Sequence, residues 1–159
     1  MRILVTNDDG VHAPGLVALV RALAAWTAEA GHELVVVAPL ANHSGASAAV
    51  GTVDERESVG FRRIHIDGAE SVPTFGVDAT PALTVVIGAF GAFGPPPDLV
   101  VSGINLGVNV GRSVLHSGTV GAVLTGAQHG LRGLAVSMRS QPLPHHWDTA
   151  TAVALAVAP

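Results

Sequence analysis

Two apolar runs separated by an amphipathic helix most constrain how this chain can fold. Residues 2–6 contain the run Ile3-Leu4-Val5, and residues 33–38 are almost continuously apolar and rich in valine. Such runs are typical of strands that are covered on both faces. Between them, leucine and valine recur at helical spacing over residues 16–23, and Gly31 is a natural helix end. A strand, a helix and a strand in this order predict a right-handed crossover and therefore a parallel sheet.

The rest of the chain continues this alternation and predicts an α/β fold. We expect a Rossmann-like three-layer α/β/α arrangement with a mostly parallel central sheet, in a single domain over residues 1–159. Residues 50–77, which include the charged segment 54–57, are the least regular part and are expected to form a hairpin-like excursion. The remaining predicted elements are strands at 61–66 and 71–77, a helix at 79–93, a strand at 98–102, a helix at 120–127, a strand at 134–138 and a helix from Trp147.

Composition and charge exclude several classes of function. Only 13% of the residues are charged, the formal net charge is -4, and the arginines are scattered with no lysine beside them, so no nucleic-acid polymer is expected as a partner. The absence of cysteine removes disulfides and thiolate chemistry and is compatible with a cytoplasmic location. The amino terminus becomes polar too soon for a secretory leader. The longest apolar stretch, 82–93, is interrupted by glycine, so no membrane span is expected.

Two adjacent carboxylates follow the first predicted strand. Asp8 and Asp9 therefore lie at the carboxyl edge of the sheet, where open α/β folds bind ligands. Neighbouring carboxylates repel each other and are costly to bury, and a divalent cation is the simplest compensation. Together with the amide of Asn7 they offer oxygen ligands, which suit Mg²⁺ or Mn²⁺. The alternative is a plain polar turn, because Asx residues followed by glycine are common in turns.

Two further loops and a helix start are expected at the same edge. Residues 42–47 are small and polar and follow the second strand, and residues 102–111 are rich in glycine and asparagine. Residues 117–119 precede a helix, whose free N–H groups and positive dipole end suit an anion. A cation site that faces an anion site indicates phosphoryl chemistry.

Four segments also match a known family in order: ILVTNDDG, VVAP followed by NHSG, PDLVVSGINLGVNVG, and HSGTVGA. They closely resemble the SurE family of metal-dependent nucleotidases, also called survival protein E, over residues 1–137. The resemblance implies removal of phosphate from nucleoside 5′- and 3′-monophosphates, with a small-molecule nucleotide as the partner. It also implies one divalent cation per subunit, Mg²⁺ or Mn²⁺, held by Asp8, Asp9, Ser44 and Asn105.

Further residues are expected on the phosphate side, where the resemblance implies Asn109 and residues 117–119. A protonated His116 imidazole could contact a phosphate oxygen, and it completes a catalytic set with Asp8 and Asn105. No Ser, Cys or Asp is placed as a covalent nucleophile, so we expect direct attack by metal-activated water, with Asp8 as a candidate base. The expected phosphate-binding residues are Asn7, Ser44, Gly45, Asn109, Ser117, Gly118 and Thr119.

Other histidines and tryptophans have simpler interpretations. His43 is expected to be a solvent-facing loop residue. His145 and His146, with Asp148 nearby, are expected to belong to a solvated linker rather than a metal site. Trp26 and Trp147 are expected to pack in the core rather than to stack on a base.

Two departures from the family pattern leave alternatives open. Residues 79–84 lack an aspartate that relatives usually have there, which concerns recognition of the base or sugar. The carboxyl-terminal region that contributes to the oligomer of relatives is expected to be short or absent, and a homodimer or homotetramer is expected. The alternatives are a phosphatase for a specialised small phosphate and a non-catalytic binding or assembly member.

Overall fold

The computed structural model describes residues 1–51, 58–141 and 143–158. The charged segment 54–57 lies outside these ranges. The helices and strands alternate along most of the chain: β1 (Arg2–Thr6), α1 (Pro14–Ala30), β2 (Glu33–Pro39), β3 (Phe61–Arg63), β4 (Thr74–Val77), α2 (Pro81–Ala89), β5 (Leu99–Leu106), the 3₁₀ helix η1 (Gly111–His116), α3 (Gly118–Gln128), β6 (Arg132–Met138) and α4 (Trp147–Val157).

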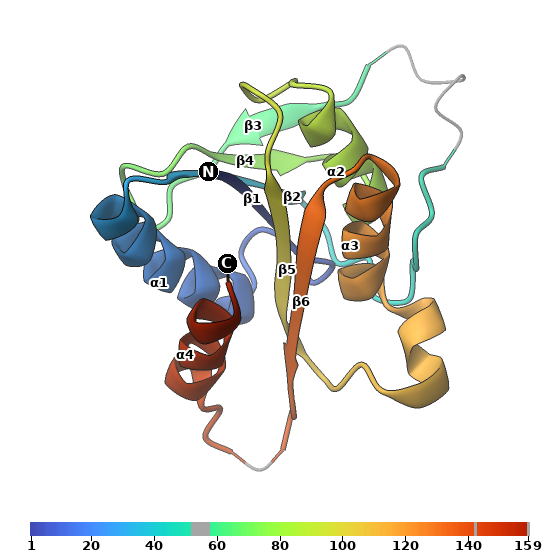
Figure 1. Ribbon diagram of the computed structural model, residues 1–159. Helices are drawn as coiled ribbons and strands as arrows, with labels where there is room; N and C mark the ends of the chain where they lie inside the picture. Colours follow the sequence, from blue (N-terminus) through green and yellow to red (C-terminus); the bar gives the residue numbers. More distant parts are fainter. Residues whose placement is uncertain (52–57, 142, 159) are drawn as a thin grey trace.

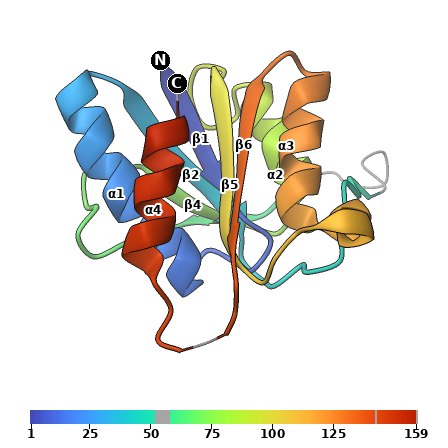
Figure 2. The same ribbon diagram turned by 60° about the horizontal axis from the view of Figure 1, so that its bottom comes forward.

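The strands form one sheet in the order β3-β4-β2-β1-β5-β6. All neighbours pair in parallel except β3, which is antiparallel to β4. Figures 1 and 2 show α1 and α4 on one face of the sheet and α2 and α3 on the other. The predicted three-layer α/β/α fold with a mostly parallel sheet is therefore confirmed.

The core has two parts because the central strands are buried on both faces. Ile3 and Val5 of β1 pack in the cluster beneath α1 and α4, whereas Leu4 packs in the cluster beneath α2 and α3. Side chains of a strand point alternately to opposite faces, so an apolar run rather than an alternating pattern is required here. The first predicted strand, helix and strand accordingly agree closely with β1, α1 and β2.

The middle of the chain differs from the prediction. The expected hairpin exists, but it is part of the main sheet, since β4 pairs in parallel with β2. Both strands are shorter than predicted, and the helix predicted over 79–93 ends at Ala89. Gly91 has a φ of 83°, a left-handed conformation that does not continue a helix.

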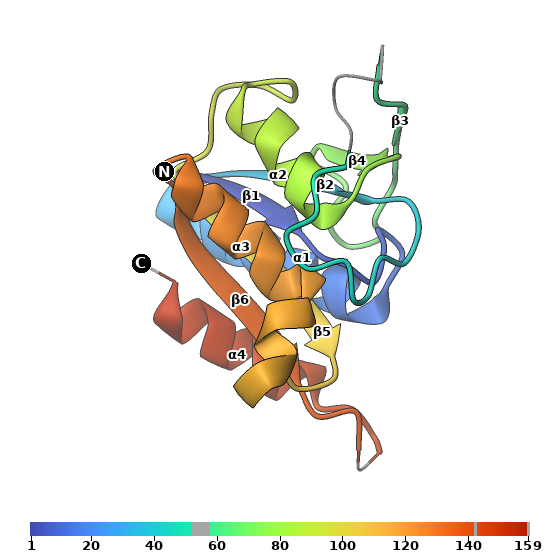
Figure 3. The same cartoon turned by 90° about the vertical axis from the view of Figure 1, so that its right-hand side faces the viewer.

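The glycine-rich segment 102–111 was predicted to be a loop, but its first half is strand. β5 continues to Leu106 and pairs with β6 up to Met138, with a register irregularity between Ser102 and Asn105. Figure 3 shows η1 between the end of β5 and the start of α3. The chain thus turns back at the carboxyl edge of the sheet directly after β5.

Candidate active site

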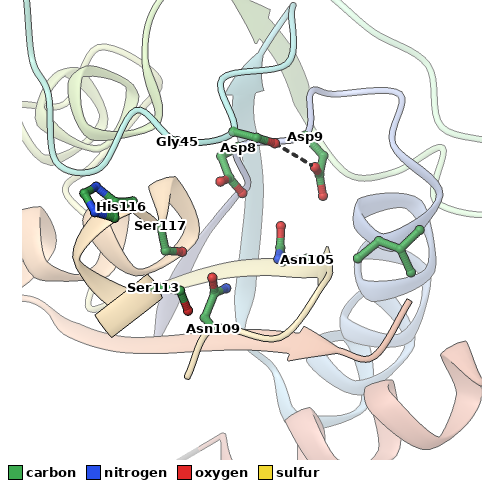
Figure 4. Close-up of a pocket in the computed structure, with 10 residues that line it drawn as sticks. Asp8, Asp9, Gly45, Asn105, Asn109, Ser113, His116 and Ser117 are labelled. Carbon is green, nitrogen blue, oxygen red and sulfur yellow. Dashed lines mark hydrogen bonds between the residues drawn. The ribbon is translucent and has the colours of Figure 1, made fainter. Parts of the chain in front are cut away.

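A pocket of about 280 Å³ opens at the carboxyl ends of β1 and β5. These neighbouring strands continue into helices on opposite faces, so the pocket lies at the switch point of the sheet, where open α/β folds bind ligands. The predicted loops meet here (Figure 4). The lining residues are Asp8, Asp9, Ser44, Gly45, Asn105, Leu106, Asn109, Ser113, His116 and Ser117.

Asp8 is held in place by the first turn of α3. It is 3% exposed, and Thr119 Oγ1 donates a hydrogen bond of 2.6 Å to its Oδ1. A Cβ on Gly118 would lie 2.7 Å from the Asp8 Cβ, so a residue other than glycine would push the helix away. Gly118 and Thr119 thus orient the carboxylate from behind and are not among the lining residues.

Asp9 is half-buried beside Asp8. Burial and the negative charge of Asp8 raise the pKa of Asp9 above its ordinary value, while hydrogen bonds with Ser44 and Asn42 oppose this rise. Ser44 Oγ donates to Asp9 Oδ1 at 3.4 Å. Burial and mutual repulsion disfavour the negative charge on this carboxylate pair, so binding of a cation would stabilise the pair.

Asn105 adds an amide oxygen to the pair. Its Nδ2 donates to the Gly107 carbonyl at 2.6 Å, which leaves Oδ1 available for a ligand. Figure 4 shows this oxygen pointing toward the space between Asp8 and Asp9. Over the described ranges, no group of three or more His, Asp or Glu could hold a metal, so neutral oxygens from Asn105 and Ser44 would have to complete a cation site. This all-oxygen set fits Mg²⁺ or Mn²⁺.

The other side of the pocket offers hydrogen-bond donors. Ser117 caps α3, and its hydroxyl accepts the N–H of Val120 at 3.1 Å, so the first turn of the helix opens at the pocket. Asn109 Nδ2 is buried without a hydrogen-bond partner among the described groups. Figure 4 shows His116 and Ser117 on the side away from Asp9. An unpaired donor beside a helix N-terminus suits an oxyanion such as phosphate.

Asn7 has a structural position rather than a place in the pocket lining. It is fully buried, its Nδ2 donates to the Gly10 carbonyl at 2.9 Å, and its Oδ1 accepts the Gly10 N–H at 3.3 Å. Both ends of the amide are therefore used to close the turn that presents Asp8 and Asp9. Asn7 is predicted as a cation ligand and phosphate contact, but it is not among the residues that line the pocket.

The Ser44 loop is fixed against α3. Ser47 Oγ donates to the Leu115 carbonyl at 2.7 Å, and the His43 N–H donates to the Asp8 carbonyl at 2.7 Å. A Cβ on Gly121 would collide with the Ser47 carbonyl, so glycine permits this close approach. These contacts place Ser44 and Gly45 at the pocket.

Two lining residues were not predicted from the sequence. Ser113 belongs to η1, and no motif or spacing marks it. Leu106 was visible only as an apolar residue in a glycine-rich segment. Their place in the pocket depends on how β5 and η1 turn at the edge of the sheet.

Of the histidines given simpler interpretations, His145 and His146 do not line the pocket, whereas His43 is partly exposed in the loop beside Ser44. His145 Nε2 contacts the Ser140 carbonyl at 3.0 Å, and His146 and Asp148 are exposed. Trp26 and Trp147 both pack against the core, as predicted. In the part of the chain that the structure describes, no helix combines the length and apolar character needed to cross a membrane.

Comparisons with known proteins identify relatives of this chain. A protein named 5′-nucleotidase SurE from Methanopyrus kandleri is 44% identical over 86% of this chain and 48% of its own length. A protein named 5′/3′-nucleotidase SurE from Salmonella paratyphi B is 41% identical over 99% of this chain and 56% of its own. The chain thus spans about half the length of the curated relatives it matches.

The fold has a solved counterpart. The crystal structure of the SurE protein from Aquifex aeolicus has a TM-score of 0.80 and 31% identity, and the match covers 99% of this chain and 58% of that one. The family model described as survival protein SurE matches residues 3–159. This chain therefore belongs to the survival protein SurE family.

Proposed function

We propose that this protein is a divalent-metal-dependent phosphomonoesterase that hydrolyses nucleoside 5′- and 3′-monophosphates to nucleoside and phosphate. The observation that supports this most is the single pocket in which the oxygens of Asp8, Asp9 and Asn105 lie opposite the α3 N-terminus. The names of the relatives, 5′-nucleotidase and 5′/3′-nucleotidase, support the choice of substrate class.

Asp8, Asp9, Ser44 and Asn105 would hold one cation per subunit. When bound, Mg²⁺ or Mn²⁺ would supply Lewis-acid stabilisation of the charge on the phosphoryl oxygens and a lower pKa for the attacking water. The side chains do the positioning: Thr119 fixes the Asp8 carboxylate, and Gly107 fixes the Asn105 amide.

The donors on the other side would hold the phosphate. Asn109 Nδ2 has no hydrogen-bond partner among the described groups, and the free N–H groups in the first turn of α3 would favour an anion near the capping residue Ser117. His116 is exposed at the rim and would donate a hydrogen bond to a phosphate oxygen when protonated. Donors aimed where negative charge develops stabilise the transition state.

The setting of the enzyme is also a proposal. The absence of cysteine fits a cytoplasmic location. Exposed apolar side chains beside the pocket, Val110 at 64% and Leu115 at 70% exposure, support association of copies into a homodimer or homotetramer. A phosphatase for a specialised small phosphate is the second candidate, because residues 79–84 depart from the family pattern.

The test is phosphate release from nucleoside 5′- and 3′-monophosphates and an aryl phosphate, with Mg²⁺, Mn²⁺ or EDTA. Wild-type protein is compared with Asp8→Asn and with Asp148→Asn, which changes an exposed carboxylate on α4. We expect activity that requires the cation and falls at least about a hundredfold in Asp8→Asn but not in Asp148→Asn. Absence of release by folded wild-type protein under every condition would contradict the proposal and favour a non-catalytic member. Preference for the aryl phosphate would favour the second candidate.

A further inference from the structure

A second cavity, also of about 280 Å³, adjoins the proposed catalytic pocket. Asp9 and Leu106 line both cavities, so the two share a wall. Figure 4 shows Asp9 on the side of the catalytic pocket away from His116 and Ser117. The second cavity therefore lies beside the end of the pocket that is opposite the proposed phosphate donors.

The lining of the second cavity is mainly apolar. It is formed by the start of α1, the end of β5 and the start of α4, with Ala13, Ile104, Leu106 and Trp147 among its residues. Trp147 packs against the core but keeps part of its surface exposed, and its ring lies edge-on to His145 at 5.4 Å between centroids. An aromatic surface in an apolar cavity suits a flat heterocycle.

The Asn42 side chain on this wall already has hydrogen-bond partners. Asn42 Oδ1 accepts the Ser44 N–H at 2.8 Å, and the Asn42 side chain also hydrogen-bonds to Asp9. Asn42 thus fixes the wall instead of reading the edge of a ligand. A mainly apolar cavity with an aromatic wall binds a ring chiefly by shape and stacking, which every base offers.

We propose that this cavity binds the nucleoside of the substrate, with the base stacked against Trp147. The inference rests on the proposed function, because the nucleoside is the part of the substrate that the phosphate and cation groups do not bind. It gives Trp147 a second role beside the predicted packing, since Trp147 both packs against the core and lines the cavity.

Trp147 is itself a reporter, and the experiment needs no turnover. In a Trp26→Phe variant Trp147 is the remaining tryptophan, since the chain has two. Its fluorescence is titrated with adenosine, uridine, ribose 5-phosphate and inorganic phosphate. The matched control is Trp147→Phe, in which the remaining Trp26 lies about 16 Å along α1 from the turn that lines the cavity.

We expect saturable quenching by adenosine and uridine in Trp26→Phe, with dissociation constants within about tenfold of each other, and no quenching by ribose 5-phosphate or phosphate. The Trp147→Phe control should show no change. In the Trp26→Phe background, Ala13→Leu, which fills the cavity, should weaken nucleoside binding roughly tenfold or more, whereas Ala13→Ser should not. Melting temperatures verify that both variants fold.

Three results would overturn the inference: no quenching by either nucleoside, equal quenching of Trp26 in the control, or quenching that Ala13→Leu leaves unchanged. These results are independent of the phosphatase assay. Quenching in a protein that releases no phosphate would support the nucleoside cavity while the proposed hydrolysis fails. Phosphate release from nucleotides without quenching would support hydrolysis while the cavity assignment fails.

Discussion

At the scale of single residues, the site consists of side chains that are fixed at one end and free at the other. Asn105 uses its amide nitrogen on Gly107 and keeps its oxygen for the pocket, while Asn109 keeps a buried nitrogen without a partner in the described structure. The sequence predicted Asp8 and Asp9 because they directly follow an apolar strand. It could not predict that Thr119 holds Asp8, since that hydrogen bond joins residues 111 positions apart.

Removing the Thr119 hydroxyl should weaken the cation site while leaving the pocket shape intact. In Thr119→Val the buried Asp8 carboxylate loses its 2.6 Å hydrogen bond, and we expect cation affinity to fall roughly 10–100-fold, as is usual when a partner of a metal ligand is removed. Calorimetric titration with Mn²⁺ measures this effect. Thr119→Ser retains the hydroxyl and should recover most of the affinity. A valine variant with wild-type affinity would mean that packing alone orients Asp8.

At the scale of elements, patterns that repeat locally were predictable and those set by distant partners were not. β1, α1 and β2 follow from apolar runs and helical spacing. The extension of β5 to Leu106 did not follow, because its glycines indicate a loop and only pairing with β6 makes it a strand. β3 was predicted too long because its exposed residues have no apolar face to mark its end.

The packing of the Ser44 loop on α3 gives a prediction at this scale. Alanine at Gly121 would favour the helix by about 1 kcal/mol, but its Cβ would collide with the Ser47 carbonyl and displace the loop. We therefore expect Gly121→Ala to weaken Mn²⁺ binding by about as much as Ser44→Ala does. The double variant should bind Mn²⁺ no more weakly than either single variant, because both substitutions remove the same ligand. Additive losses in this cycle would show that Gly121 acts elsewhere.

At the scale of the whole molecule, the fold concentrates uncompensated charge at one edge of the sheet. Asp8 and Asp9 follow β1, Asn105 ends the neighbouring strand, and α3 closes the pocket from one face. The predicted parallel sheet was sufficient to bring these segments together, because parallel strands end at the same edge. The stability of the molecule should therefore depend on whether a proton or a cation is bound at that edge.

This dependence should appear in the melting temperature. Burial and Asp8 raise the pKa of Asp9 in the folded protein above the ordinary 3.8. At a pH between 3.8 and this raised pKa, the folded state therefore binds more protons than the unfolded state. With EDTA, this contribution to stability is therefore greatest at low pH and is lost as the pH rises through the folded pKa.

A bound cation replaces the proton on the Asp9 carboxyl. The stabilisation by the cation should therefore increase over the same pH range in which the contribution of that proton is lost. At about 100 times its dissociation constant it adds about 2.7 kcal/mol, which raises the melting temperature of a chain of this size by roughly 5–10 °C. Scanning calorimetry from about pH 4 to about pH 8, with Mg²⁺ or with EDTA, measures both trends. Asp9→Asn should remove the Asp9 contribution to the pH trend in EDTA and most of the cation effect together. If the variant kept the cation effect in full, Asp9 would not be a ligand, and its raised pKa would reflect burial beside Asp8 alone.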